Sequence, residues 1–62
     1  MELSTQDYLK KTILDTQERV RDFMHYADKI PEERLQQYFR EYAAMEGFQA
    51  RRLQEFLEDM PR

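Results

Sequence analysis

The residues best suited to chemistry in this chain interrupt an otherwise apolar helical pattern. Glu46 and Gln49 are three residues apart, a spacing that places both side chains on one face of a helix. Thr16 interrupts the apolar pattern of an earlier segment in the same way. Because an unpartnered carboxylate is costly to bury, Glu46 must be hydrogen-bonded, bind a ligand or lie outside the core.

These three residues have two main interpretations. In the first, Thr16, Glu46 and Gln49 form a polar layer that fixes register and oligomeric state, as a buried Asn does in coiled coils. In the second, Glu46 and Gln49 bind a divalent metal ion at the centre of a helical bundle, because oxygen ligands suit hard cations. A wrong register, which would leave Glu46 in contact with water, is a third possibility.

Two long helices are predicted to position these residues. One Gly and two Pro in 62 residues, with abundant Glu, Gln, Arg and Leu, are typical of a helical protein. Ser4 is a good N-cap, so the first helix is predicted over about 5–29, with a contact between Leu3 and Tyr8 at its start. Two ion pairs with a spacing of four residues are expected along it, Asp7 with Lys11 and Asp15 with Arg19.

A proline separates the two predicted helices. Pro31 disfavours helical geometry at Ile30 but suits the first position of a new helix. The second helix is therefore predicted over about 31–59, ending before Pro61. A connection this short makes the two helices antiparallel neighbours.

Apolar residues recur in both predicted helices at alternating steps of four and three, the heptad pattern. The stripe of the first helix comprises Leu9, Ile13, Thr16, Val20, Phe23, Ala27 and Ile30. The stripe of the second helix comprises Leu35, Phe39, Tyr42, Glu46, Gln49, Leu53, Phe56 and Met60, with Ala43, Ala50 and Leu57 on an adjoining row. Three apolar positions per heptad suit a helix that contacts several neighbours, as in a four-helix bundle.

The length of the chain indicates self-association. A 62-residue chain is marginal as a monomer, and without cysteine it has neither disulfides nor thiolate metal sites to stabilise it. We therefore predict an all-α fold with a single domain, residues 1–62, whose antiparallel hairpins form a four-helix bundle by homodimerisation. The predicted dimer face comprises Val20, Phe23, Phe39, Tyr42, Leu53 and Phe56, and it encloses the polar layer.

The segment 42–53, YAAMEGFQARRL, carries a resemblance to a known family. From about residue 9 to 57 the chain resembles half of a ferritin-like or rubrerythrin-like bundle, in which the first helix of a hairpin carries a metal-binding Glu and the second carries Glu-x-x-His. The resemblance places Glu46 at the Glu position, but Gln49 replaces the His and Thr16 lies near the first-helix Glu. It implies a half-bundle with a degenerate metal motif, too poor in ligands for a redox di-iron centre.

Gly47 and two outward-facing apolar residues each allow two interpretations. Gly47 either permits close approach of another backbone beside Glu46 or is a tolerated defect within a helix. Leu14 and Phe48 are either ordinary exposed side chains or part of a second contact surface.

Charge and motifs exclude several classes of function. The net charge is −3 with both signs interspersed, so no basic tract favours nucleic acid. No apolar run approaches the roughly 18 residues of a membrane span, and the N-terminus does not resemble a signal peptide, so a cytoplasmic protein is expected. A glycine-rich phosphate loop and a hydrolytic triad are both missing, so no catalysis is expected.

The predicted function is therefore that of a small structural or interaction protein without a cofactor. It is expected to act as a homodimer or, in a variant of this hypothesis, as a hairpin that completes the bundle of another protein. The alternative is a ferritin-like protein that binds a divalent metal ion through Glu46 and Gln49.

Overall fold

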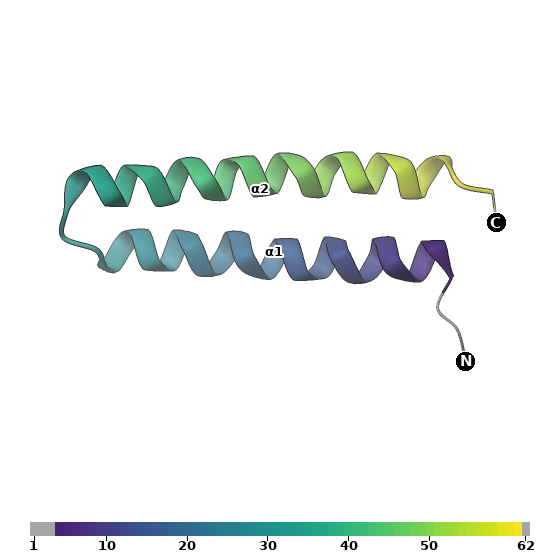
Figure 1. Ribbon diagram of the computed structural model, residues 1–62, viewed down its shortest axis with the longest axis horizontal. Coiled ribbons are helices and arrows are strands. Elements are labelled where there is room, and N and C mark those ends of the chain that lie inside the picture. The colour runs from purple at the N-terminus through teal and green to yellow at the C-terminus, as the bar shows by residue number, and fades with distance from the viewer. Residues whose placement is uncertain (1–3, 62) are drawn as a thin grey trace.

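The computed structural model describes residues 4–61 and contains two α-helices joined by a short connection (Figure 1). Helix α1 spans Thr5–Lys29 and helix α2 spans Glu33–Asp59. The helices lie side by side and antiparallel, so the start of α1 and the end of α2 meet at one end of the molecule (Figure 1). The predicted all-α antiparallel hairpin is confirmed.

Helix α1 begins where its capping signal predicts. The Ser4 hydroxyl accepts a hydrogen bond from the Asp7 N–H, and the Asp7 carboxylate accepts one from the Ser4 N–H, each at 3.1 Å. These bonds hold the pKa of the Asp7 carboxyl below its ordinary value, mainly because the Ser4 N–H stabilises the ionised form. The predicted contact of Leu3 with Tyr8 lies outside the described residues.

Helix α2 begins two residues later than predicted, and Pro31 lies in the connection. Glu32 keeps an extended backbone and acts as the N-cap. Its carboxylate accepts hydrogen bonds from the N–H groups of Arg34 at 2.9 Å and Leu35 at 2.8 Å. A carboxylate outside the helix thus satisfies two N–H groups that the first turn leaves unpaired, which explains the later start.

Side-chain amides join the helices at both ends of the hairpin. At the turn, Gln36 donates hydrogen bonds to the carbonyl groups of Ala27 at 2.9 Å and Ile30 at 3.2 Å. At the opposite end, Gln6 donates to the carbonyl group of Pro61 at 3.1 Å. These contacts bring the two helices into a fixed alignment along their length.

The most buried residues of the contact between the helices are mainly small. They are Ile13, Thr16 and Ala27 on α1, and Ala43 and Ala50 on α2. Among residues 4–61, no large side chain is fully buried. The Cα atoms extend over 46 × 23 × 10 Å, so the hairpin is a single layer of helices. Domains ordinarily need two packed layers to enclose a core.

The face of α2 that contacts α1 keeps every second residue of the predicted stripe and replaces each of the others by the next residue along the chain. The less exposed residues of α2 include Gln36, Phe39, Ala43, Glu46, Ala50, Leu53, Leu57 and Met60, again at alternating steps of three and four. We call this row the inner seam of α2. Four residues of the predicted stripe are instead exposed, namely Leu35, Tyr42, Gln49 and Phe56. The alanines occupy the seam because small side chains allow two helix axes to approach closely.

Candidate functional site

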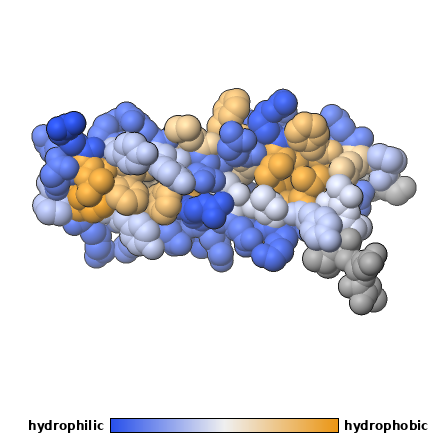
Figure 2. All heavy atoms as spheres, viewed as in Figure 1, coloured by the Kyte–Doolittle hydropathy of each residue, from blue (hydrophilic) through white to orange (hydrophobic). Residues whose placement is uncertain are grey.

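Polar residues interrupt the contact between α1 and α2 near its middle. Figure 2 shows hydrophobic residues gathered in two stretches along the hairpin, with a band of hydrophilic residues between them. The sequence places the predicted polar layer in this central region.

Thr16 is buried, but its polar group is satisfied within its own helix. Its side chain is 3% exposed, and its hydroxyl donates a hydrogen bond to the carbonyl group of Thr12 at 2.8 Å. This bond to the preceding turn is the ordinary solution for a threonine inside a helix. Thr16 therefore needs no ligand or partner chain to remain buried.

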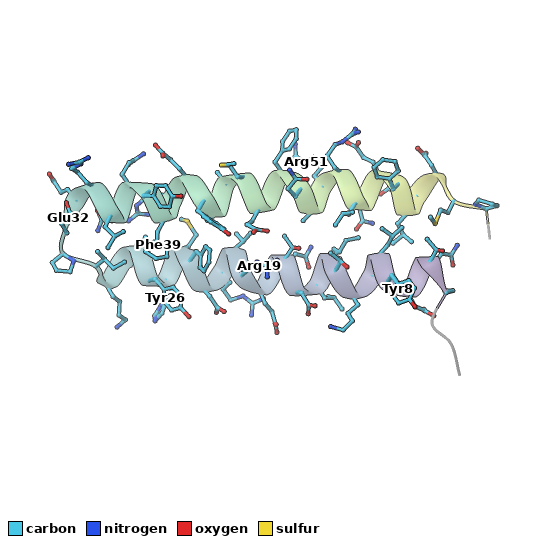
Figure 3. All side chains as sticks on the ribbon, in the orientation of Figure 1. Tyr8, Arg19, Tyr26, Glu32, Phe39 and Arg51 are labelled. Atoms are coloured by element: carbon cyan, nitrogen blue, oxygen red, sulfur yellow. The ribbon has the colours of Figure 1, made fainter. Side chains whose placement is uncertain are left out.

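Glu46 lies on the inner seam and has a cationic partner on the other helix. Its Oε1 lies 3.4 Å from Nε of Arg19, and the two side chains are 19% and 46% exposed. Figure 3 shows Arg19 near the midpoint of α1. The ion pair accounts for a carboxylate at the seam, because an opposite charge offsets part of the cost of removing it from water.

The pairing of Arg19 with Glu46 was not predicted from the sequence. Both predicted ion pairs along α1 are wrong, because Lys11 pairs with Asp15 at 2.9 Å, while Arg19 reaches across to Glu46 and Asp7 caps the helix. Two features of the sequence could have predicted Arg19 as the partner of Glu46. Arg19 lies beside the apolar stripe of α1, and a hairpin folded at Ile30 places it at the height of Glu46.

Gln49 is exposed and does not lie on the seam. It lines a surface groove of about 220 Å³ together with Tyr42, Met45 and Glu46. The structure thus brings Glu46 and Gln49 to one groove. Thr16 and Glu46 lie between the helices, whereas Gln49 lies at the edge.

The metal-ligating residues of the hairpin are dispersed. Over residues 4–61, no group of three or more His, Cys, Asp or Glu side chains is arranged to hold a metal ion. The guanidinium group of Arg19 already lies beside the Glu46 carboxylate. His25, the one histidine, is exposed on α1. A cation at Glu46 would have to displace Arg19.

The six apolar residues predicted for the dimer face all keep some exposure. Four are half-buried along the contact between the helices: Val20, Phe23, Phe39 and Leu53. Tyr42 and Phe56 are exposed. The hairpin therefore leaves part of each of these side chains available to a further neighbour.

An aromatic cluster covers the half of the hairpin near the turn. The ring of Phe23 packs edge-to-face against Phe39, at 5.4 Å between centroids, and against Tyr42 at 4.8 Å. Tyr26 lies 6.0 Å from Phe23 and 6.2 Å from Phe39. Figure 3 shows Tyr26 and Phe39 toward the turn, on facing helices. Such pairs stabilise the hairpin beyond simple burial, yet Tyr26 and Tyr42 remain exposed.

A second apolar row runs along the exposed side of α2. We call it the outer stripe, and its large apolar residues are Leu35, Tyr38, Tyr42, Met45 and Phe56, with Gln49 and Arg52 at the intervening positions. The five apolar side chains are between 39% and 69% exposed. The guanidinium group of Arg52 lies over the ring of Phe56, 5.5 Å from its centroid. The outer stripe repeats the heptad spacing of the inner seam, one residue earlier in the sequence.

Gly47 lies beside a groove on the other side of the hairpin. The groove has a volume of about 420 Å³ and is lined by Gln17, Val20, Gly47, Ala50, Arg51 and Gln54. A Cβ atom added at Gly47 would meet nothing within 4 Å. Packing within the hairpin therefore does not require glycine at this position.

The chain matches no protein-family model, no curated protein and no solved structure. Of the ferritin-like resemblance, the structure bears out the antiparallel two-helix hairpin. Neither described helix is long and apolar enough to cross a membrane.

Proposed function

We propose that this protein is a structural or interaction protein whose working form is a homodimer, in which two hairpins form a four-helix bundle. The distribution of large apolar side chains carries the proposal. Across the described part of the chain, Ile13 is the only large apolar residue that is buried. Ten others are exposed: Tyr8, Leu14, Met24, Tyr26, Leu35, Tyr38, Tyr42, Met45, Phe48 and Phe56.

The free energy of folding favours a second layer of helices packed on top of this hairpin. Full burial of a large apolar side chain contributes about 1.5–3 kcal/mol, and the inner seam buries mostly alanine. The ordering of a chain costs about 1–2 kcal/mol per residue in backbone entropy alone, so a helical layer this thin is poorly compensated as a monomer. A second hairpin packed on the exposed apolar side chains would supply the missing layer.

The proposal is tested by the concentration dependence of thermal unfolding. For a homodimer that unfolds to monomers, the melting temperature followed by circular dichroism rises with protein concentration, because association stabilises the folded state by mass action. A melting temperature that stays constant on serial dilution, with the helical signal intact, contradicts the proposal.

A metal-binding bundle is the second candidate, favoured by the shared groove of Glu46 and Gln49. In a dimer, two copies of these residues would supply carboxylate and amide oxygens, which suit hard cations. The Arg19 guanidinium would have to move away from Glu46 to admit the ion.

Glu46→Leu separates the two candidates. If the Arg19–Glu46 pair is only structural, the substitution is neutral or slightly stabilising, because Arg19 is 46% exposed and stays hydrated without its partner while leucine suits the seam. If the site binds Fe²⁺, Mn²⁺ or Zn²⁺, these ions raise the melting temperature of the unaltered protein and the substitution abolishes the rise. Elemental analysis without bound metal, together with unchanged melting in all three ions, contradicts the metal candidate.

A further inference from the structure

We propose that the outer stripe is the surface through which α2 packs, antiparallel, against α2 of a second copy of this chain, with the twofold axis near Met45. The inference rests on the proposed homodimer and specifies which surface forms it. It differs from the dimer face predicted from sequence, four residues of which lie on the contact between α1 and α2.

The angle between the two apolar rows of α2 suits a helix that packs against two neighbours. One residue corresponds to about 100° around a helix with 3.6 residues per turn. The outer stripe precedes the inner seam by one residue along the whole of α2. The two rows therefore face nearly perpendicular directions. Helix α1 covers the inner row and touches the outer stripe at Tyr42, which packs against Phe23. A helix at the corner of a four-helix bundle contacts its two neighbours at about this angle.

The corresponding side of α1 is more polar than the outer stripe. Arg19 and Tyr26 each come one residue before a less exposed position of α1, just as the outer stripe comes one residue before the inner seam, so in an antiparallel hairpin they lie on the same side as the outer stripe. The exposed residues around them include Asp15 and Asp22. Because charged groups lose hydration when an apolar surface covers them, the second copy is expected to centre on α2.

The outer stripe is complementary to itself in the antiparallel direction. Leu35 lies ten residues before Met45 and Phe56 lies eleven after it, so the stripe is nearly symmetric about Met45. A twofold axis beside Met45, between residues 45 and 46, places Leu35 opposite Phe56 of the second copy. It also places Tyr42 opposite Gln49 of the second copy, where hydroxyl and amide can exchange a hydrogen bond. Met45 is the most exposed of the large apolar residues described, at 69%.

Charges at the edge of the stripe favour the same direction. Arg34 and Glu55 each precede an end residue of the stripe. An antiparallel pair places Arg34 near Glu55 of the second copy at both ends. A parallel pair would instead place Arg34 beside Arg34 of the second copy, and Glu55 beside Glu55. Glu55 accepts a hydrogen bond from Arg52 at 3.0 Å within the chain, and a carboxylate has capacity for further donors.

Single introduced cysteines test the contact, because the chain has none of its own. In an antiparallel pair, a residue lies close to the same residue of the second copy only if it is near the twofold axis. Met45→Cys is therefore expected to form a disulfide-linked dimer under mild oxidation, since bridged Cα atoms lie about 4.4–6.8 Å apart. Leu14→Cys, an equally exposed apolar site on α1, is the matched control and is expected to remain monomeric on a denaturing gel.

A mixture of two variants determines the direction. Leu35→Cys and Phe56→Cys should each stay unlinked alone and form a covalent heterodimer when mixed. Self-linking of Leu35→Cys alone overturns the antiparallel direction, and Leu14→Cys linking as readily as Met45→Cys overturns the contact surface. Sedimentation of the variants without oxidant separates the two proposals. If the chain is a dimer but Met45→Cys forms no disulfide between copies, only this inference is contradicted. If the chain is a folded monomer, the proposed function is contradicted as well.

Discussion

The two apolar rows of α2 differ in the size and exposure of their side chains. The inner seam is buried at Ala43 and Ala50, where small side chains let α1 approach. The outer stripe carries Leu35, Tyr42, Met45 and Phe56 at exposed positions. These four large side chains are between 39% and 69% exposed, so much of their apolar surface is still open to a further neighbour. This contrast is the observation on which the proposed homodimer rests.

The largest expected effect comes from a charge on the outer stripe. Met45→Glu removes an apolar side chain that contributes about 1.5–3 kcal/mol when fully buried, and it does so twice per dimer. It also brings two carboxylates together near the proposed axis. We expect the dimer to dissociate at micromolar concentration, measured by sedimentation velocity.

Leu14→Glu is the control for this prediction, because it places the same charge on an exposed apolar residue of α1. It should leave the dimer intact. Equal weakening by both substitutions would remove the distinction between the outer stripe and the rest of the surface.

A larger side chain on the inner seam should destabilise the hairpin. Ala43 is 2% exposed, so Ala43→Leu forces α1 and α2 apart and should lower the free energy of unfolding by about 1–3 kcal/mol. Chemical denaturation measures this loss. Ala44→Leu, at the exposed neighbouring position, should change stability by less than about 0.5 kcal/mol. If Ala43→Leu proves as harmless as its neighbour, the alanine seam is not the contact between the helices.

A smaller, stabilising effect is expected at Gly47, on the side away from the outer stripe. Because an added Cβ has free space, Gly47→Ala should stabilise α2 by about 0.5–1 kcal/mol through helix propensity. Thermal unfolding of the two proteins at matched concentration measures it. Destabilisation would instead mean that another backbone approaches Gly47 in the dimer, placing a second contact on the groove side.

The smallest effect concerns acid stability at the start of α1, outside both rows. The folded-state pKa of Asp7 is lowered from its ordinary value of 3.8. Its stabilising contribution is therefore complete above that value and is lost as the pH falls through the lower folded-state pKa. Asp7→Asn should flatten the acid limb of the unfolding curve without altering dimer mass. An unchanged acid limb would show that the capping box does not form in solution.

Local signals in the sequence were sufficient to predict the hairpin. Ser4 and Asp7 define the start of α1 through bonds within one turn, and Pro31 locates the connection. The N-cap of α2 was missed because Glu32 is an uncommon cap, effective here because its carboxylate reaches two N–H groups.

The orientation of α2 could not be predicted from periodicity. Two adjoining rows of α2 both carry the heptad spacing, so the pattern alone does not say which faces α1. The choice depends on how closely Ala43 and Ala50 let the helices approach and on the Arg19–Glu46 pair across the hairpin. Both are properties of two helices together, which is why Arg19 was missed and why Gln49 was expected on the seam.

Sedimentation equilibrium of the unmodified chain at micromolar concentration decides whether two hairpins form a homodimer. We expect a helical species with twice the 7.7 kDa mass of one chain. A stably folded species of 7.7 kDa, with the same helical content, would contradict it.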